Sequence, residues 1–262
     1  MNSSYGNVLD NRSLTVAARK HSFRAATVRE RYVSPLLVLA AFALSAAPVG
    51  APGFNNEQLR YSIIWSSGLS LGEAQLRATL LKPAQDTERR HLEFELDAAV
   101  PGYAVSDRYK SDASSDFCSA EFQRTTTHGR KKTDEKTTFD AQSGTATRQT
   151  AGGGKSELKS PTCGKDALTY LYFVRRELSQ GRIPPPQTVF FGAAYEVRVE
   201  FAGTQKIRVG DDQADADRLT ASVKGSASDI SFEVFFLKDA ARTPALVRVP
   251  LALGTFSMEL VK

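Results

Sequence analysis

The chain has 262 residues and a formal charge of +5 at pH 7. Most of this excess lies in residues 1–51, which hold six basic and two acidic side chains, so residues 52–262 keep 28 basic against 27 acidic ones. A stretch so close to neutral lacks the positive charge on which nucleic-acid binding rests, and no nucleic-acid partner is expected.

An uncharged, largely apolar run spans residues 32–47 behind Arg29 and Arg31. It is shorter than the roughly 20 apolar residues that span a bilayer, and small residues and a Pro/Gly-rich stretch follow it. This pattern predicts a secretory signal peptide within a leader of residues 1–51, cleaved between Ala46 and Ala51. A membrane anchor and a buried core helix are the competing interpretations. The signal implies that residues 52–262 are exported as a single β-rich domain. We expect this domain in the periplasm or associated with the outer envelope, without a stable transmembrane anchor.

Alternating apolar residues predict strands in the next part of the chain. Leu59, Tyr61, Ile63 and Trp65 share one face of residues 58–65, and the same period of two recurs in residues 69–81 and 91–96. Gly72 marks a candidate β-bulge. Because short turns separate these strands, an antiparallel all-β arrangement is favoured over βαβ units.

Residues 118–150 are polar and rich in threonine, which predicts exposed hairpins anchored chiefly by Phe122 and Phe139. Residues 151–160 are expected to form a flexible, Gly-rich linker. Their AGGGKS segment is not a phosphate-binding loop, because Gln149 stands where such a loop needs glycine.

Cys118 and Cys163 are the two cysteines of the chain. In an oxidising compartment an even pair at this separation predicts one structural disulfide. Two buried free thiols and a redox pair are the alternatives, although no CxxC spacing supports redox chemistry.

One amphipathic helix is predicted over residues 165–178, because Leu168, Leu171, Tyr172 and Arg175 recur at helical spacing. Gly181 and three prolines after it end the helix. We expect the sheet to cover Arg175, and a covered charge needs a partner. Asp239 is the first candidate for that partner and Asp166 the second. The alternative is that Arg175 waits in an open cleft for an anionic head group.

The remaining residues predict strands at 188–191, 194–201, 205–209, 218–223, 230–237, 245–251 and 255–261. In residues 230–237 apolar side chains nearly fill both faces, which indicates a central strand or a helix-covered sheet. The acidic segment 211–217 is interpreted as a solvated hairpin turn, with weak calcium binding as the alternative.

No catalytic residue, metal ligand or cofactor is predicted. His91 and His128 are the two histidines beyond the leader, and they are expected at a strand edge and in a turn, as solvated rings. Their number and spacing fit neither a catalytic triad nor a zinc site.

Three segments together resemble a known family. They are the opening LRYSIIWSSGLSLGEAQL, the helix DALTYLYFVRREL and the closing FLKDAARTPALVRVPLALGTFSMEL. The chain resembles the bacterial envelope family of domain of unknown function 3108, whose members open with GE-x-L-x-Y-x-V-x-W and carry a D-x-L-x-x-L-Y-x-x-R helix. This chain has Asn56-Glu57 where the family often has Gly-Glu. The matching positions, interpreted as structural, are Tyr61, Trp65, Gly68, Asp166, Leu168, Tyr172, Arg175, Gly181, Asp239, Arg242, Pro244 and Leu260.

The resemblance implies a β-rich exported domain and no mechanism. The expected fold is mainly β, a large curved antiparallel sheet (an open or partial barrel) with one packed α-helix. The leading hypothesis for function is a non-catalytic envelope protein that binds an apolar or lipid-like ligand or serves as a structural module. The alternatives are a hydrolase of envelope polysaccharide with paired carboxylates and a module that binds envelope proteins through the threonine hairpins.

Overall fold

The computed structural model describes residues 54–81, 88–100, 102–226, 229–251 and 254–261. The predicted leader, including residues 32–47, lies outside them. The strands before the helix are β1 (Glu57–Trp65), β2 (Ser70–Leu81), β3 (Arg89–Val100), β4 (Tyr103–Ser114), β5 (Ser119–His128), β6 (Lys131–Asp140), β7 (Thr145–Thr150), β8 (Lys155–Lys159) and β9 (Lys165–Asp166). After helix α1 (Ala167–Ser179) come β10 (Gln187–Phe190), β11 (Ala194–Val209), β12 (Asp212–Lys224), β13 (Asp229–Leu237), β14 (Pro244–Leu251) and β15 (Gly254–Val261).

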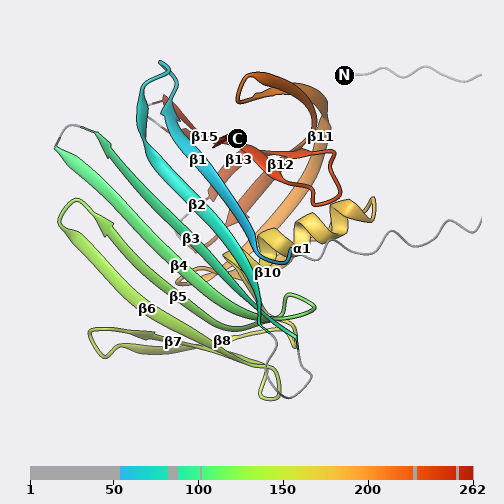
Figure 1. Cartoon of the computed structure of the whole chain (residues 1–262). Helices are drawn as coiled ribbons and strands as arrows, with labels where there is room; N and C mark the ends of the chain where they lie inside the picture. Colours follow the sequence, from blue (N-terminus) through green and yellow to red (C-terminus); the bar gives the residue numbers. More distant parts are fainter. Residues whose placement is uncertain (1–53, 82–87, 101, 227–228, 252–253, 262) are drawn as a thin grey trace, which may run out of the picture. The chain divides into compact units, whose positions relative to one another are not determined.

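The described strands form one 15-stranded sheet that does not close on itself. From one edge to the other, the strands follow in descending order from β8 to β1 and then from β15 to β9. Every pairing is antiparallel except that of β9 with β10. The first strand in the chain, β1, pairs with the last, β15, near the middle of the sheet, where Arg60 lies opposite Val261. The sheet curls around its concave face, with α1 near one end of the strands (Figure 1). The prediction of a curved antiparallel sheet with one helix is confirmed.

Helix α1 packs its two sides against different parts of the concave face. Leu168 and Tyr172 belong to a buried cluster with β1, β2 and β3, whereas Tyr170, Val174 and Leu178 pack against strands β10 to β13. The helix therefore fills one end of the interior and joins the two walls of the curled sheet.

Local chemistry fixes both ends of this helix. Asp166 caps the N-terminus, where its side chain accepts hydrogen bonds from the backbone N–H groups of Leu168 and Thr169. Gly181 adopts a positive φ of 72° at the other end, and its backbone N–H donates to the carbonyl of Leu178. The helix begins at Ala167 rather than Lys165, because residues 165–166 form β9 beside β10.

A sharp bend divides β11 into two parts. The register shifts between Phe201 and Thr204, and Gly203 has a φ of 112° that favours glycine. Beyond the bend, residues of β11 and β12 pack against the outer side of β13 and β14, where Phe235 is fully buried. We predicted two separate strands here, and the structure shows one bent strand.

Strand β13 confirms the expectation of a central strand. It pairs with β12 on one side and β14 on the other. Its neighbouring residues Phe235 and Phe236 are both buried, in clusters on opposite faces. Both faces of this strand need apolar residues because the bent part of β11 and β12 covers the outer one.

Two sequence predictions about loops are wrong. Residues 151–160 are not a flexible linker, because residues 155–159 form β8 and pair with β7. The acidic segment 211–217 is not a turn throughout, since the turn ends at Asp211 and the rest belongs to β12. Within it, Asp217 is ion-paired with Arg242 at 2.8 Å.

Gly72 confirms the predicted bulge. The register of β1 and β2 shifts opposite this residue, between Ile63 and Ile64. On its other side β3 approaches so closely that a Cβ at position 72 would overlap the carbonyl oxygen of Asp97. Only glycine lets the two strands lie this close.

The structure joins Cys118 and Cys163 in a disulfide, with their Cα atoms 4.7 Å apart. Cys118 immediately precedes β5 and Cys163 lies just before β9. A backbone hydrogen bond from Ser119 N–H to the carbonyl of Gly164, at 2.9 Å, runs beside it. The disulfide therefore fixes the start of the helix to the threonine-rich hairpins.

Candidate functional site

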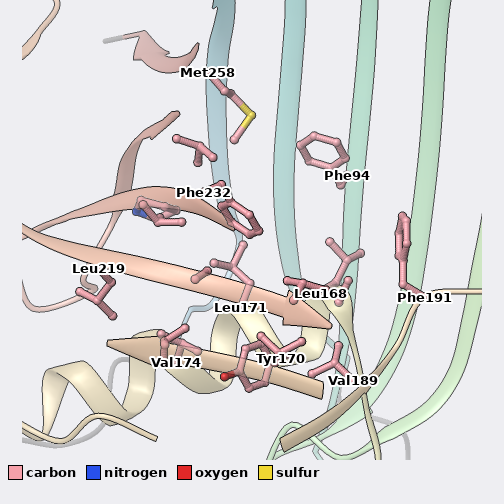
Figure 2. Close-up of a pocket in the computed structure, with 18 of the residues that line it drawn as sticks. Phe94, Leu168, Tyr170, Leu171, Val174, Val189, Phe191, Leu219, Phe232 and Met258 are labelled. Carbon is pink, nitrogen blue, oxygen red and sulfur yellow. The ribbon is translucent and has the colours of Figure 1, made fainter. Parts of the chain in front are cut away.

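A cavity of about 530 Å³ lies between α1 and the concave face of the sheet. The helix supplies Leu168, Tyr170, Leu171 and Val174, and the opposite wall comes from β1 to β4 and β10 to β15 (Figure 2). Its side chains share an apolar or aromatic character, for example Phe94, Phe191, Val199, Ala221, Phe232, Phe236 and Met258. The volume lies in the range of small-molecule sites, about 300–1,000 Å³.

No charged side chain lines this cavity among the described residues, and its polar side-chain atoms are tyrosine hydroxyls. Tyr61 donates to the carbonyl of Pro244 at 2.9 Å, and Tyr109 donates to Asp107 Oδ2 at 2.8 Å. The buried hydroxyl of Tyr170 has no hydrogen-bond partner among the described residues. The lining therefore offers little to a polar ligand.

Burial keeps these tyrosines neutral. Desolvation raises the pKa of Tyr170 to about 12. It also raises the pKa of Tyr61 and of Tyr109, and for Tyr109 the Asp107 carboxylate adds to the shift. The lining consequently carries no charge near neutral pH.

A second cavity of about 770 Å³ continues the interior toward the turns that join β1 to β2 and β3 to β4. Val247 and Met258 line both cavities, so the two lie next to each other. The lining of this second cavity is again apolar apart from Asp107 and Ser257, and includes Ile63, Trp65, Leu96, Val100, Tyr103, Val249, Leu251 and Phe256. Together the two cavities form an elongated apolar interior.

Arg175 does not face either cavity. Its side chain is fully buried, and its guanidinium forms a two-pronged ion pair with Glu57, at 2.7 Å from Nη1 to Oε2 and 2.6 Å from Nη2 to Oε1. Tyr172 donates a further hydrogen bond to Glu57 Oε2 at 2.9 Å. Burial disfavours the charged guanidinium, but Glu57 outweighs it and raises the pKa of Arg175. Arg175 thus ties α1 to the start of β1.

The partner that we predicted for Arg175 is wrong. Asp239 accepts hydrogen bonds from the backbone N–H and the hydroxyl of Thr243, at 2.9 and 2.6 Å, and so closes the loop between β13 and β14. Asp166 caps the helix. The signal that could have revealed Glu57 is the family's Gly-Glu opening, because Asn56 takes the place of the glycine with a φ of 54°, a region that asparagine tolerates.

Several of the family-motif residues are linked through the loop before β14, and two of them, Tyr61 and Pro244, line the first cavity. Tyr61 bonds to the backbone of Pro244, Arg175 Nε donates to the carbonyls of Ala241 and Arg242 at 3.1 and 3.2 Å, and Arg242 pairs with Asp217. Trp65 lies apart, near the other end of β1, edge-on to Phe256 with ring centroids 4.4 Å apart. These contacts join β1, α1 and the loop before β14 and give the motif residues a structural role.

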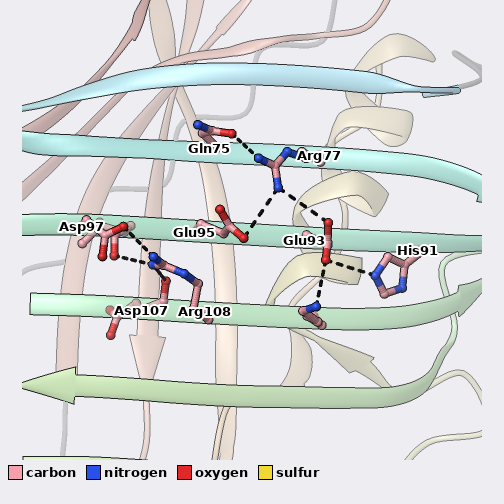
Figure 3. A network of polar contacts seen from close by, with 10 residues as sticks. Gln75, Arg77, His91, Glu93, Glu95, Asp97, Asp107 and Arg108 are labelled. Carbon is pink, nitrogen blue, oxygen red and sulfur yellow. Dashed lines mark hydrogen bonds and ion pairs between the residues drawn. The ribbon is translucent and has the colours of Figure 1, made fainter.

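The outer face of β2, β3 and β4 carries a network of charged side chains (Figure 3). Arg77 lies 3.8 Å from Glu93 and 3.6 Å from Glu95, and Lys110 lies 3.2 Å from Glu93. Burial alone would raise the pKa of Glu93, but hydrogen bonds from Lys110 and His91 lower it overall. A general acid needs a raised pKa instead, which Glu93 does not have.

Both described histidines hydrogen-bond to carboxylates. His91 Nδ1 lies 2.6 Å from Asp112 Oδ1, and His128 Nε2 lies 2.8 Å from Asp107 Oδ1. Among the residues that the structure describes, no cluster of three or more His, Cys, Asp or Glu side chains could hold a metal ion. In the same residues no helix is long and apolar enough to cross a membrane.

The fold is similar to that of a solved structure that shares little sequence with this chain. The crystal structure of a β-barrel-like protein of the domain of unknown function DUF1849 from Brucella abortus matches with a TM-score of 0.55 and 11% identity. The match covers 80% of this chain and 98% of that one. At this identity the likeness concerns the fold alone. No curated protein matches the chain.

The sequence itself matches a family over most of its length. The family described as "Protein of unknown function (DUF3108)" matches residues 60–261, a stretch that runs from β1 to the end of β15. The match includes the motif residues from Tyr61 to Leu260. The chain belongs to this family.

Proposed function

We propose that the protein binds an apolar, lipid-like ligand inside the curled sheet and does not transform it, as an exported protein of the cell envelope. The observation that carries the proposal is the pair of neighbouring cavities of about 530 and 770 Å³, lined by apolar side chains. Burial of apolar ligand surface there contributes about 25 cal/mol per Å². The apolar run at residues 32–47 supports the envelope location.

The first test is an extraction of the purified protein with organic solvent, followed by mass spectrometry of the extract. We expect a co-purified lipid in stoichiometric amount. An empty protein that also fails to bind the neutral apolar dye Nile red would contradict the proposal.

A cavity-filling variant locates the binding. Ala221 is buried on β12 and lines the first cavity, between Val199 on β11 and Phe232 on β13. Ala221→Phe should lower the amount of bound lipid and of bound Nile red, because the ring occupies the ligand's space. Thr220→Phe is the matched control, since Thr220 is the preceding residue on the same strand and points to the opposite face. Equal loss in both variants would place the ligand elsewhere.

A further inference from the structure

Four neighbouring hairpin turns lie at one end of the curled sheet, an end that the connections of β7 to β8 and of β12 to β13 also share. They join β1 to β2, β3 to β4, β5 to β6 and β14 to β15, which are neighbours in the sheet, so the antiparallel order brings these turns to the same end (Figure 1). We call this end the turn rim. Its described residues are 65–70, 100, 102–103, 128–132, 251 and 254. None of them is Asp or Glu.

Large apolar side chains project from the turn rim. Leu69, Tyr103 and Leu251 are 60, 48 and 49% exposed. A single exposed apolar side chain is ordinary, but here two leucines and a tyrosine lie on neighbouring turns. Tyr103 and Leu251, with Trp65, also line the second cavity. The exposed apolar surface therefore adjoins the second cavity, and the turn rim borders this end of the interior, which we call its mouth.

A basic cluster lies directly beside this apolar surface. Arg130, Lys131 and Lys132 are exposed on the turn between β5 and β6, and none of the three forms a salt bridge with a described residue. Lysines elsewhere on the sheet do form them, as Lys136 does with Glu121 at 2.7 Å. The turn touches Tyr103, since Gly129 N–H donates to the carbonyl of Ala104 at 2.8 Å and the Tyr103 ring packs against Gly129.

We infer that the turn rim docks onto a lipid bilayer that carries anionic headgroups, with the mouth of the interior against the membrane. Exposed leucine and aromatic side chains enter the interface between headgroups and acyl chains, and lysine and arginine beside them bind the anionic headgroups. The inference goes beyond ligand binding, because it assigns the surface through which an apolar molecule passes between membrane and interior.

Trp65 makes the docking measurable, because it is the single tryptophan of the chain and lies on the turn rim. The probes are phosphatidylcholine vesicles with and without phosphatidylglycerol, each prepared with brominated acyl chains that quench nearby tryptophan. We expect quenching with the phosphatidylglycerol vesicles that weakens at high salt. Contact through the leader alone would leave Trp65 unquenched, and this result would overturn the inference.

Paired variants test the charge. Lys131→Gln with Lys132→Gln should weaken vesicle binding roughly 30-fold, since each lysine near an anionic surface contributes a factor of about five. The control is Arg89→Gln with Lys159→Gln. It removes two exposed charges at those ends of β3 and β8 that lie away from the turn rim, and it should leave vesicle binding unchanged. Leu69→Ser with Leu251→Ser should reduce quenching at equal vesicle concentration.

Two results would overturn the inference. One is the absence of quenching with either vesicle, which is expected if the turn rim binds a protein partner instead. The other is quenching that the lysine variant leaves unchanged, which is expected if a lipid enters the interior without docking. Neither result bears on co-purified lipid, so failure here is distinguishable from failure of the proposed ligand binding.

Discussion

Arg175 shows how one buried charge can connect parts of the chain that are far apart. Its guanidinium packs against the rings of Phe54 and Tyr172, 4.4 and 4.8 Å from their centroids, and is paired with Glu57. The helical spacing predicted that the sheet would cover Arg175. It could not identify the partner, because Glu57 precedes Arg175 by 118 residues and several carboxylates were equally plausible in the sequence.

Arg175→Ala should therefore lower the free energy of unfolding by about 3–5 kcal/mol, because it leaves the Glu57 carboxylate without its partner. Chemical denaturation followed by circular dichroism measures this change. Arg182→Ala is the matched control, since Arg182 is exposed and pairs with Glu177 on the surface, and it should leave stability nearly unchanged. An Arg175→Ala protein that unfolds like the parent while losing its bound lipid would show instead that Arg175 contacts the ligand.

The buried carboxyl of Asp166 predicts that the stability of the folded protein depends on pH. Burial raises the pKa of this carboxyl above its ordinary value of 3.8, although Ser111, Ser119 and two backbone N–H groups donate to it. Because the folded state holds the proton more tightly than the unfolded state, this group contributes most stability below pH 3.8 and loses it as the pH rises through the raised value. The stability of the parent relative to Asp166→Asn should fall over that range. Denaturation curves at a series of pH values measure the difference, and a difference that grows with pH would contradict the prediction.

At the scale of elements, periodicity predicted the strands well where one face is buried. Residues 58–65 alternate because β1 has a covered and an uncovered face, and Tyr61 and Ile63 are buried as expected. The error at residues 151–160 has a clear cause. Strand β8 is an edge strand with mostly exposed residues, so it needs few apolar side chains and its sequence resembles a linker.

The disulfide stabilises the elements around the helix start. Cys118 and Cys163 are 45 residues apart, and closing a loop of that length contributes about 3–4 kcal/mol in the chain-entropy model. Reduction should lower the thermal stability of the parent but not that of a Cys118→Ser, Cys163→Ser variant. Intact-mass measurement with and without reductant checks the bond itself. Two thiols that alkylate freely in the native protein would contradict it.

At the scale of the whole molecule, the fold class could be predicted and the interior could not. The antiparallel order and the single helix follow from local patterns, but the strand number does not, since β4 and β8 were not predicted and β11 was predicted as two strands. The cavities arise because residues as distant as Leu76, Leu168 and Val247 face one space. No local pattern reports whether facing apolar residues fill such a space or leave it open.

The proposed signal peptide leads to a prediction about the whole chain. N-terminal sequencing of protein from a periplasmic or secreted fraction should begin between Ala47 and Pro52, because small residues suited to signal cleavage lie there. An uncleaved chain recovered from the cytoplasm would contradict both the leader and the proposed location.

The pairing of β1 with β15 has a consequence for how the protein folds. Strand β15 follows all others in the chain, yet it lies between β1 and β14 near the middle of the sheet. Until it arrives, β1 and β14 have unpaired edges and the two parts of the sheet are separate. Contacts of such long range form slowly, so the sheet assembles only after the chain has been delivered up to residue 261. A chain cut after Leu251 should expose its core and aggregate, and the export that we propose would be compatible with this late assembly, because the sheet would be completed only after transport.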